Sequence, residues 1–145
     1  MSKTSKPRSW RFVAVAFLAL AISSCGRKNL YPVHGKLFVD DRPAAGAIIQ
    51  FNPVAATAAA GASPYGHVDA TGGFTLSTFA TNDGASPGEY VVTIQWHRRR
   101  SNPFEADGPD KLQGRYSQAS TSTLKVRIEP KPNELEPFRL STGSK

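Results

Sequence analysis

Few side chains in this chain of 145 residues have the types and spacing that chemistry requires. The three histidines, His34, His67 and His97, are widely separated, and their spacing matches no compact metal site. Each is expected to be a partly exposed imidazole, and neither a metal nor a cofactor is expected. Cys25 is the one cysteine in the chain, so an internal disulfide is excluded and its thiol needs another explanation.

The densest positive charge is a run of three arginines, Arg98, Arg99 and Arg100. With Trp96 just before it, this run could contact a polyanion or a lipid headgroup through charge and cation–π interactions. Acidic residues follow closely at positions 105, 107 and 110 and would partly neutralise the run. The alternative is an ordinary solvated loop.

Four aspartates near predicted turns, Asp40, Asp41, Asp69 and Asp83, are candidate oxygen ligands for calcium. The chain contains no Asp-rich loop of the EF-hand type, however. Aspartate side chains also accept hydrogen bonds from the backbone of tight turns. We therefore expect these residues to cap turns rather than to bind a metal.

The first 25 residues fall into three parts. Residues 1–11 are polar and basic, residues 12–22 are an unbroken apolar run, and the small residues Ser23 and Ser24 lead into Cys25. This order is that of a secretory signal peptide. Eleven apolar residues are too few for a stable membrane span, which needs about 20. The pattern predicts a signal peptide over residues 1–24.

The end of this segment, Leu-Ala-Ile-Ser-Ser-Cys at residues 20–25, resembles the bacterial lipobox. The resemblance implies a diacylglyceryl group on the Cys25 thiol, cleavage before Cys25, and a tether over residues 25–31. Stable anchoring requires two or more acyl chains. Gly26 stands where an aspartate would favour the inner membrane, so the outer membrane is slightly favoured. The alternative is an ordinary cleaved signal with a coincidental cysteine.

The net charge of +7 does not indicate nucleic-acid binding. Four basic residues and no acidic residue precede Cys25, so removal of the signal peptide would leave a net charge of +3. Export would also separate the protein from nucleic acid. The mature domain is thus expected to carry an ordinary solubility charge.

After the tether, apolar and polar residues alternate with a period of two between turn-forming residues, which is typical of short strands. The pattern predicts an all-β fold, an antiparallel β-sandwich of about seven strands over residues 32–141, with a tail over residues 142–145. Turns are expected at residues 40–43 and 131–134, and a hairpin is expected between residues 65–69 and 74–78. The expected core residues are Val33, Leu37, Ile49, Phe51, Phe74, Leu76, Tyr90, Val92, Ile94, Trp96, Val126, Ile128, Phe138 and Leu140.

Residues 97–122 form the longest predicted loop, and a small-residue loop is expected over residues 54–64. Loops longer than about 12–15 residues are uncommon in compact domains and tend to be functional or disordered. Phe104, Leu112 and Tyr116 indicate that part of the longer loop packs against the domain. A binding surface is therefore expected first in residues 97–122.

Three segments carry a family resemblance. They are Val-His-Gly-Lys-Leu at residues 33–37 with Gly-Ala-Ile-Ile-Gln-Phe at 46–51, Asp-Ala-Thr-Gly-Gly-Phe-Thr-Leu at 69–76, and Pro-Gly-Glu-Tyr-Val-Val-Thr-Ile at 87–94. Together they resemble carboxypeptidase-regulatory-like domains, which have a transthyretin-like (prealbumin) sandwich. The whole chain resembles small transthyretin-like lipoproteins of planctomycete-type bacteria. The match departs at residues 41–43, where a glycine often leads into the proline. Each matched residue has a structural role, so the resemblance implies a fold rather than a function.

These features predict a membrane-anchored envelope lipoprotein that presents a non-catalytic β-sandwich to other envelope proteins or to polysaccharide. One alternative is a hydrolase, because one transthyretin-like branch hydrolyses 5-hydroxyisourate with histidines, arginines and a C-terminal Tyr-Arg-Gly-Ser. Residues 140–145, Leu-Ser-Thr-Gly-Ser-Lys, do not match that motif. The other alternative is a glycan- or anion-binding module that uses residues 97–122, or the rings of Tyr65 and Tyr116.

Overall fold

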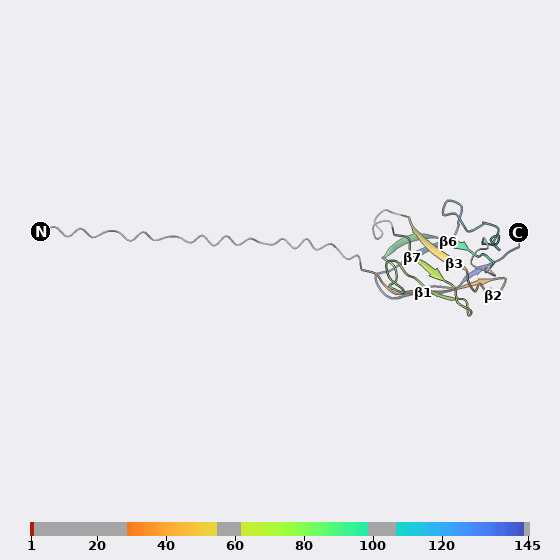
Figure 1. Ribbon diagram of the computed structural model, residues 1–145, viewed down its shortest axis with the longest axis horizontal. Coiled ribbons are helices and arrows are strands. Elements are labelled where there is room, and N and C mark those ends of the chain that lie inside the picture. Colours follow the sequence, from red (N-terminus) through yellow and green to blue (C-terminus); the bar gives the residue numbers. More distant parts are fainter. Residues whose placement is uncertain (2–28, 55–61, 99–106, 144–145) are drawn as a thin grey trace.

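The computed structural model describes Met1 and residues 29–54, 62–98 and 107–143 (Figure 1). These residues form an all-β domain of two mostly antiparallel sheets, and no helix occurs among them. Accordingly, no helix in the described ranges could span a membrane. The all-β, two-sheet architecture predicted from the alternation is confirmed. Most of the small-residue loop expected over residues 54–64 lies outside the described residues.

The first sheet is built around β1 (Val33–Val39). On one side, β1 pairs antiparallel with β5 (Gly73–Thr75) and, further along, with β2 (Arg42–Pro43). On its other side, β1 pairs in parallel with β8 (Asn133–Glu134) and then with β9 (Phe138–Leu140). Both sides of β1 are therefore covered, although each neighbouring strand is short.

The second sheet contains the longest described strand, β6 (Gly88–Gln95). Its order is β4 (Tyr65–His67), β3 (Ile48–Pro53), β6 and β7 (Lys125–Ile128), and all neighbours are antiparallel. The alternation that predicted these strands has a direct cause, since successive side chains of a strand point to opposite faces. One face of β3 and β6 therefore supplies apolar side chains to the interior.

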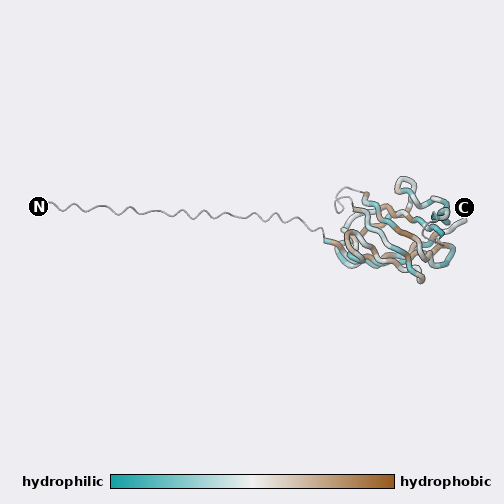
Figure 2. Tube along the Cα trace, viewed as in Figure 1, coloured by the Kyte–Doolittle hydropathy of each residue, from teal (hydrophilic) through white to brown (hydrophobic). Residues whose placement is uncertain are grey.

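The hydrophobic core lies between the two sheets, and Figure 2 shows hydrophobic stretches along the strands inside the domain. At its centre, the ring centroid of Phe51 lies 6.3 Å from that of Phe74 and 6.1 Å from that of Tyr90. The buried hydroxyl of Tyr90 donates a hydrogen bond to the carbonyl oxygen of Ser86 at 2.8 Å. Burial raises the pKa of this hydroxyl above its usual range. Most of the expected core residues are buried here.

Three of the expected core residues are half-buried at the margin of the core: Trp96, Val126 and Phe138. Trp96 follows the last residue of β6, so the alternation of that strand no longer sets its direction. Its indole Nε1 donates to the carbonyl oxygen of Ala45 at 3.1 Å, and the Lys111 ammonium lies 4.1 Å from its ring centroid. Trp96 was predicted to face the core, and it packs against the core but is only half-buried.

The prediction of a purely antiparallel arrangement was wrong at β8 and β9, which run parallel to β1. The amide of Asn133 donates to the carbonyl oxygen of Pro32 at 2.9 Å, so the chain turns back beside the start of β1. From there the chain runs along β1 in the same direction. Asn133 and Glu134, both expected within the turn at residues 131–134, form β8 instead.

The expected hairpin between residues 65–69 and 74–78 is divided between the two sheets. β4 forms its ladder with β3, and β5 forms its ladder with β1. The two segments share one isolated bridge, between Tyr65 and Ser77. The connection therefore crosses from one sheet to the other, which local sequence patterns do not reveal because both arrangements use the same turn residues.

The expected turn at residues 40–43 is a two-residue hairpin loop. Asp40 and Asp41 have φ values of 48° and 59°, as a type I′ turn requires, and Arg42 begins β2. The Asp40 carboxylate accepts hydrogen bonds from both the hydroxyl and the amide of Thr142. The Thr142 hydroxyl bond is the main reason why the pKa of Asp40 is lowered. Thr142, which the sequence assigns to the tail, is thus held against the domain.

Candidate functional site

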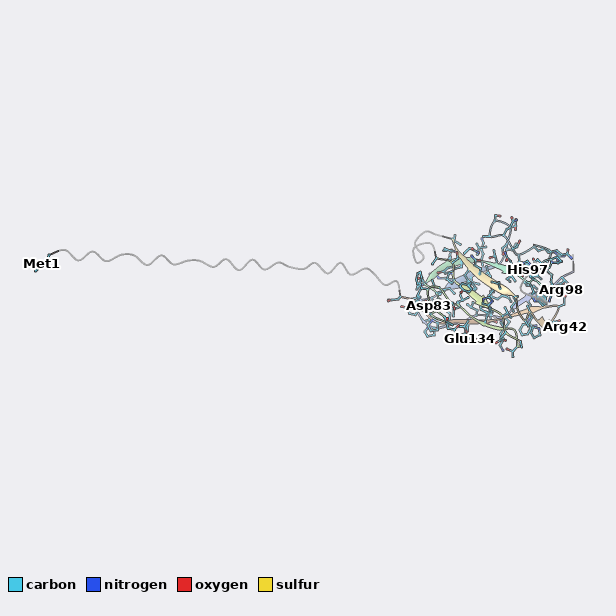
Figure 3. All side chains as sticks on the ribbon, viewed as in Figure 1. Met1, Arg42, Asp83, His97, Arg98 and Glu134 are labelled. Atoms are coloured by element: carbon cyan, nitrogen blue, oxygen red, sulfur yellow. The ribbon has the colours of Figure 1, made fainter. Side chains whose placement is uncertain are left out.

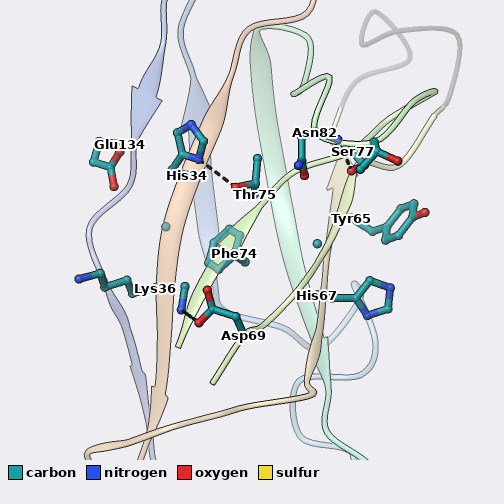
Figure 4. Close-up of a pocket in the computed structure, with 14 residues that line it drawn as sticks. His34, Lys36, Tyr65, His67, Asp69, Phe74, Thr75, Ser77, Asn82 and Glu134 are labelled. Atoms are coloured by element: carbon teal, nitrogen blue, oxygen red, sulfur yellow. Dashed lines mark hydrogen bonds between the residues drawn. The ribbon is translucent and has the colours of Figure 1, made fainter. Parts of the chain in front are cut away.

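A polar groove of about 610 Å³ lies on the outer side of the domain, over β8, β1, β5 and β4 (Figure 4). Its chemistry-bearing lining residues are His34, Lys36, Tyr65, His67, Asp69 and Glu134. The alternation of β1 turns His34 and Lys36 outward, and the alternation of β4 does the same for Tyr65 and His67. The groove therefore follows from the outward faces of strands that belong to different sheets.

Two glycines occupy inward positions in the strands beneath this groove. A Cβ atom on Gly35 would lie 2.5 Å from Cζ of Phe74, so the aromatic ring occupies the space that a side chain would need. A Cβ atom on Gly66 would lie 2.9 Å from the carbonyl oxygen of Thr75. Glycine inside a strand often marks such a close approach. Gly35 thus leaves room for the Phe74 ring beside β1, and Gly66 allows β4 to approach β5 closely.

The polar contacts of the groove are few. His34 Nδ1 and Thr75 Oγ1 are 3.0 Å apart, which is hydrogen-bonding distance. On the other wall, the rings of Tyr65 and His67 meet edge to face with their centroids 5.8 Å apart. Figure 4 shows His34 and His67 on opposite sides of Phe74, so the two imidazoles do not form one cluster. The Tyr65 side chain is 44% exposed and offers an open aromatic face.

Asp69 is occupied by its own turn. Its Oδ1 accepts hydrogen bonds from the hydroxyl and amide of Thr71, both at 2.7 Å, and from the amide of Gly73 at 2.9 Å. The hydrogen bond from the Thr71 hydroxyl is the main reason why the pKa of Asp69 is lowered. Asp69 therefore caps a turn, as predicted, and one of its oxygens is not free to bind a metal.

Asp83 also caps a turn, as predicted. Its carboxylate accepts hydrogen bonds from the amides of Thr78, Phe79 and Ala80 at 2.6, 2.9 and 2.8 Å. Burial works to raise the pKa of Asp83, but these three donors outweigh it and leave the pKa lowered. Across the described ranges, no three His, Cys, Asp or Glu side chains are grouped so that they could hold a metal ion.

The groove can therefore act through hydrogen bonds and charge. It offers an imidazole paired with a hydroxyl, an ammonium group from Lys36, a carboxylate from Glu134 and the aromatic ring of Tyr65. Open grooves with a few convergent polar groups are typical of sites for small or polymeric ligands. Sequence reasoning missed this site. The signal that could have indicated it was the alternation that turns His34, Lys36, Tyr65 and His67 outward.

The arginine run lies at a different place in the molecule. Arg98 is exposed, and Arg99 and Arg100 lie outside the described residues. Figure 3 shows Arg98 and Arg42 at one end of the sandwich, with Asp83 towards the other end. His97, next to Arg98, has its Nδ1 atom 2.8 Å from the carbonyl oxygen of Gly108.

Asp110, expected to neutralise the arginines, instead binds backbone. Its carboxylate accepts hydrogen bonds from the amides of Trp96 at 3.0 Å, Leu112 at 3.1 Å and Gly114 at 2.9 Å. Leu112 is 1% exposed and belongs to the core. The prediction that part of residues 97–122 packs against the domain is confirmed. None of these residues lines the groove.

The chain enters the sandwich at Tyr31, which forms a bridge with Ala85. Cys25, the predicted lipid-carrying residue, lies outside the described residues. Comparison with models of protein families and with curated proteins gave no match. The resemblance carried by residues 31–96 stays a prediction, so a function has to be argued from the groove, the entry point and the sequence before it.

Proposed function

We propose that this protein is an exported lipoprotein that is held on a membrane of the cell envelope by acyl chains on Cys25. The observation that carries the proposal is the order of residues 1–25: a basic segment, an apolar run too short to span a bilayer, and a single cysteine directly after two serines. Lipid attachment gives a lone cysteine at this position a chemical role. The outer membrane is the favoured location because Gly26, not aspartate, follows Cys25.

We further propose that the domain belongs to the transthyretin-like class and works as a non-catalytic interaction module. Support for the class comes from two sheets around one core and from matched residues at the turn that leads into β6. Support for a non-catalytic role comes from the groove, where the nearest partner of His34 is a threonine hydroxyl and the Asp69 carboxylate is engaged by its own turn.

The groove favours recognition of a hydroxyl-rich ligand such as a polysaccharide segment as the activity of this module. The exposed ring of Tyr65 provides a flat apolar face, and the side chains of Lys36 and Glu134 provide a donor and an acceptor. Its open shape suits a polymer that passes across it better than a small molecule that must be enclosed.

The anchor is tested by the intact mass of the protein purified from membranes of an expressing bacterium. The expected mass is that of residues 25–145 plus acyl chains. Cys25→Ser should lose the acyl mass and the membrane association, whereas the control Ser24→Ala keeps a small residue before the cysteine and should retain both. An unmodified mass for the natural sequence, cut elsewhere or not at all, would overturn the proposal.

The groove is tested by binding of the purified protein to an array of envelope polysaccharide fragments. Tyr65→Ala and Lys36→Ala should each reduce binding about tenfold, the loss of about 1.4 kcal/mol of interaction. Arg42→Ala, an exposed residue outside the groove, is the matched control and should bind normally. Binding that survives both groove variants would show that recognition occurs elsewhere.

A further inference from the structure

Two strongly exposed apolar side chains lie at the end of the sandwich where the chain enters. Phe79 is 69% exposed and Val54 is 59% exposed, which are the highest values for large apolar residues of the described sandwich. We call this end the entry pole and define it by Tyr31, Val54 and residues 77–87. Exposure of an aromatic ring to water is unfavourable by about 25 cal/mol per Å² of apolar surface, and both residues expose their apolar surface at this same end.

The topology brings these side chains to the entry pole. β5 ends at Thr75, which pairs with His34 near the start of β1, so the segment that carries Phe79 emerges beside the entering chain. β3 ends at Pro53, which pairs with Tyr90 near the start of β6, so Val54 emerges at the same end. The Tyr31–Ala85 bridge ties the entering chain to this pole directly.

Phe79 is presented by a tightly bonded loop. The Asp83 carboxylate accepts hydrogen bonds from the amide of Phe79 and from the amides of the residues on either side of it, Thr78 and Ala80. The hydroxyl of Ser77 accepts from the amide of Asn82 at 2.8 Å, and the hydroxyl of Thr78 donates to the carbonyl oxygen of Gly84. These hydrogen bonds fix the backbone of the loop that carries the exposed ring.

Cations offset part of the acidic charge near the entry pole. Glu89 lies 3.8 Å from Arg127, and Glu129 lies 2.6 Å from Lys131, so these two glutamates are paired with cations, while the exposed Glu134 also lies near this end. The Asp83 carboxylate faces backbone amides. The sequence adds two cations, at positions 27 and 28, directly after Cys25 and Gly26. Basic residues beside a membrane anchor are attracted to anionic lipid headgroups.

We infer that the entry pole rests on the bilayer and that Phe79 inserts into the boundary between headgroups and acyl chains. This inference rests on the proposed lipid anchor, and the length of the tether selects the membrane as the occupant. The segment from Cys25 to Tyr31 spans at most about 20 Å when fully extended, at about 3.4 Å per residue. Aromatic and aliphatic side chains are stabilised at this depth of a bilayer.

This orientation has consequences for the rest of the surface. The end that carries Arg42 and Arg98 points away from the membrane that holds the anchor (Figure 3). The groove runs along the side of the sandwich, from Glu134 and Asn82 near the entry pole towards Asp69 (Figure 4).

The test uses the lipidated protein in vesicles of phosphatidylethanolamine and phosphatidylglycerol with brominated acyl chains, which quench tryptophan on contact. Trp96→Phe removes the tryptophan of the mature domain, and a single probe is then introduced by Phe79→Trp. The matched control is Ile48→Trp, because Ile48 is also exposed, at 37%, but pairs with Gln95 at the opposite end of β6. Circular dichroism of each variant verifies the fold.

The expected result is that brominated lipid reduces the fluorescence of Phe79→Trp about twofold and leaves Ile48→Trp unchanged. If the intact mass shows the acyl chains but the two probes are quenched equally or not at all, the anchor stands and the insertion of Phe79 is refuted. If the mass shows no acyl chains, the anchor itself fails and the membrane contact fails with it.

Discussion

Tyr31 and Ala85 are joined by two reciprocal backbone hydrogen bonds, from the amide of each to the carbonyl oxygen of the other, at 2.9 and 3.0 Å. This isolated bridge binds the last residue of the predicted tether to the segment between β5 and β6. The point at which the tether leaves the domain is therefore held in place. Four features can be tested: this junction, the loop beside it that Asp83 caps, the packed part of residues 97–122, and the chemistry of the groove.

Any replacement of Gly84, beside this bridge, should destabilise the domain. It has a φ of +89°, and a Cβ atom there would overlap the carbonyl group of Tyr31. We expect Gly84→Ala to reduce the free energy of unfolding by about 2–3 kcal/mol through strain and steric overlap. Gly46→Ala is the matched control, since Gly46 has a similar φ of +82° with no atom within 4 Å of the added Cβ. The control should cost about 1 kcal/mol in urea unfolding. Equal costs would show that the contact with Tyr31 is unimportant.

Asp83 should make the stability of the domain sensitive to acid. Burial works to raise its pKa, but the backbone donors outweigh burial and leave the pKa below the ordinary value of 3.8, so the unfolded chain binds more protons than the folded domain near that pH. This contribution to stability is present above the unfolded-state pKa and is lost as the pH falls through the folded-state pKa. Asp83→Asn should therefore be less stable at neutral pH by about 1 kcal/mol, and the difference should disappear in acid.

The measurement for this prediction is the urea midpoint of both proteins from neutral pH down to strongly acidic pH. Asp41→Asn is the control, because Asp41 is exposed and contributes a surface ion pair with Arg139 at 3.1 Å. A difference between Asp83→Asn and the natural sequence that does not change with pH would contradict the assigned role of the carboxylate.

Asp110 should determine whether residues 107–117 stay packed. Removal of its carboxylate in Asp110→Ala leaves the amides of Trp96, Leu112 and Gly114 without their acceptor. We expect a loss of about 2 kcal/mol and faster hydrogen exchange at these amides. Lys111→Ala removes the cation over the Trp96 ring and leaves the carboxylate in place, so exchange should change little. Unchanged exchange in Asp110→Ala would show that the carboxylate is not needed to hold the segment.

The groove should not catalyse hydrolysis. We expect the purified domain to show no turnover of 5-hydroxyisourate above the spontaneous rate, because the His34 ring meets a threonine hydroxyl across the groove from His67. The assay follows substrate absorbance with and without protein. His97 lies outside the groove, so His97→Ala is the control. Turnover that is lost in His34→Ala and kept in His97→Ala would show that the domain is an enzyme and not a non-catalytic interaction module.

Local patterns in the sequence were sufficient for part of the fold. The alternation in residues 33–39 and 88–95 predicted which side chains of β1 and β6 face the core, because the direction of a side chain in a strand depends on its position alone. The aspartates at positions 69 and 83 were predicted as turn caps for an equally local reason, since they bind amides at most five residues away. The lipobox-like segment that ends at Cys25 is a third local pattern and stays a prediction.

The sequence by itself thus determined the longer strands, most of their inward faces and the capping of turns by Asp69 and Asp83, and it supplies the whole basis for the proposed anchor. The tertiary structure decided which strands pair, that β8 and β9 run parallel to β1, and that β4 and β5 belong to different sheets. It also brought His34 and His67 into one groove and Val54 and Phe79 to one pole. Pairing depends on contacts between residues far apart in the chain, whereas alternation is a property of one strand, so only the folded arrangement could reveal these surfaces.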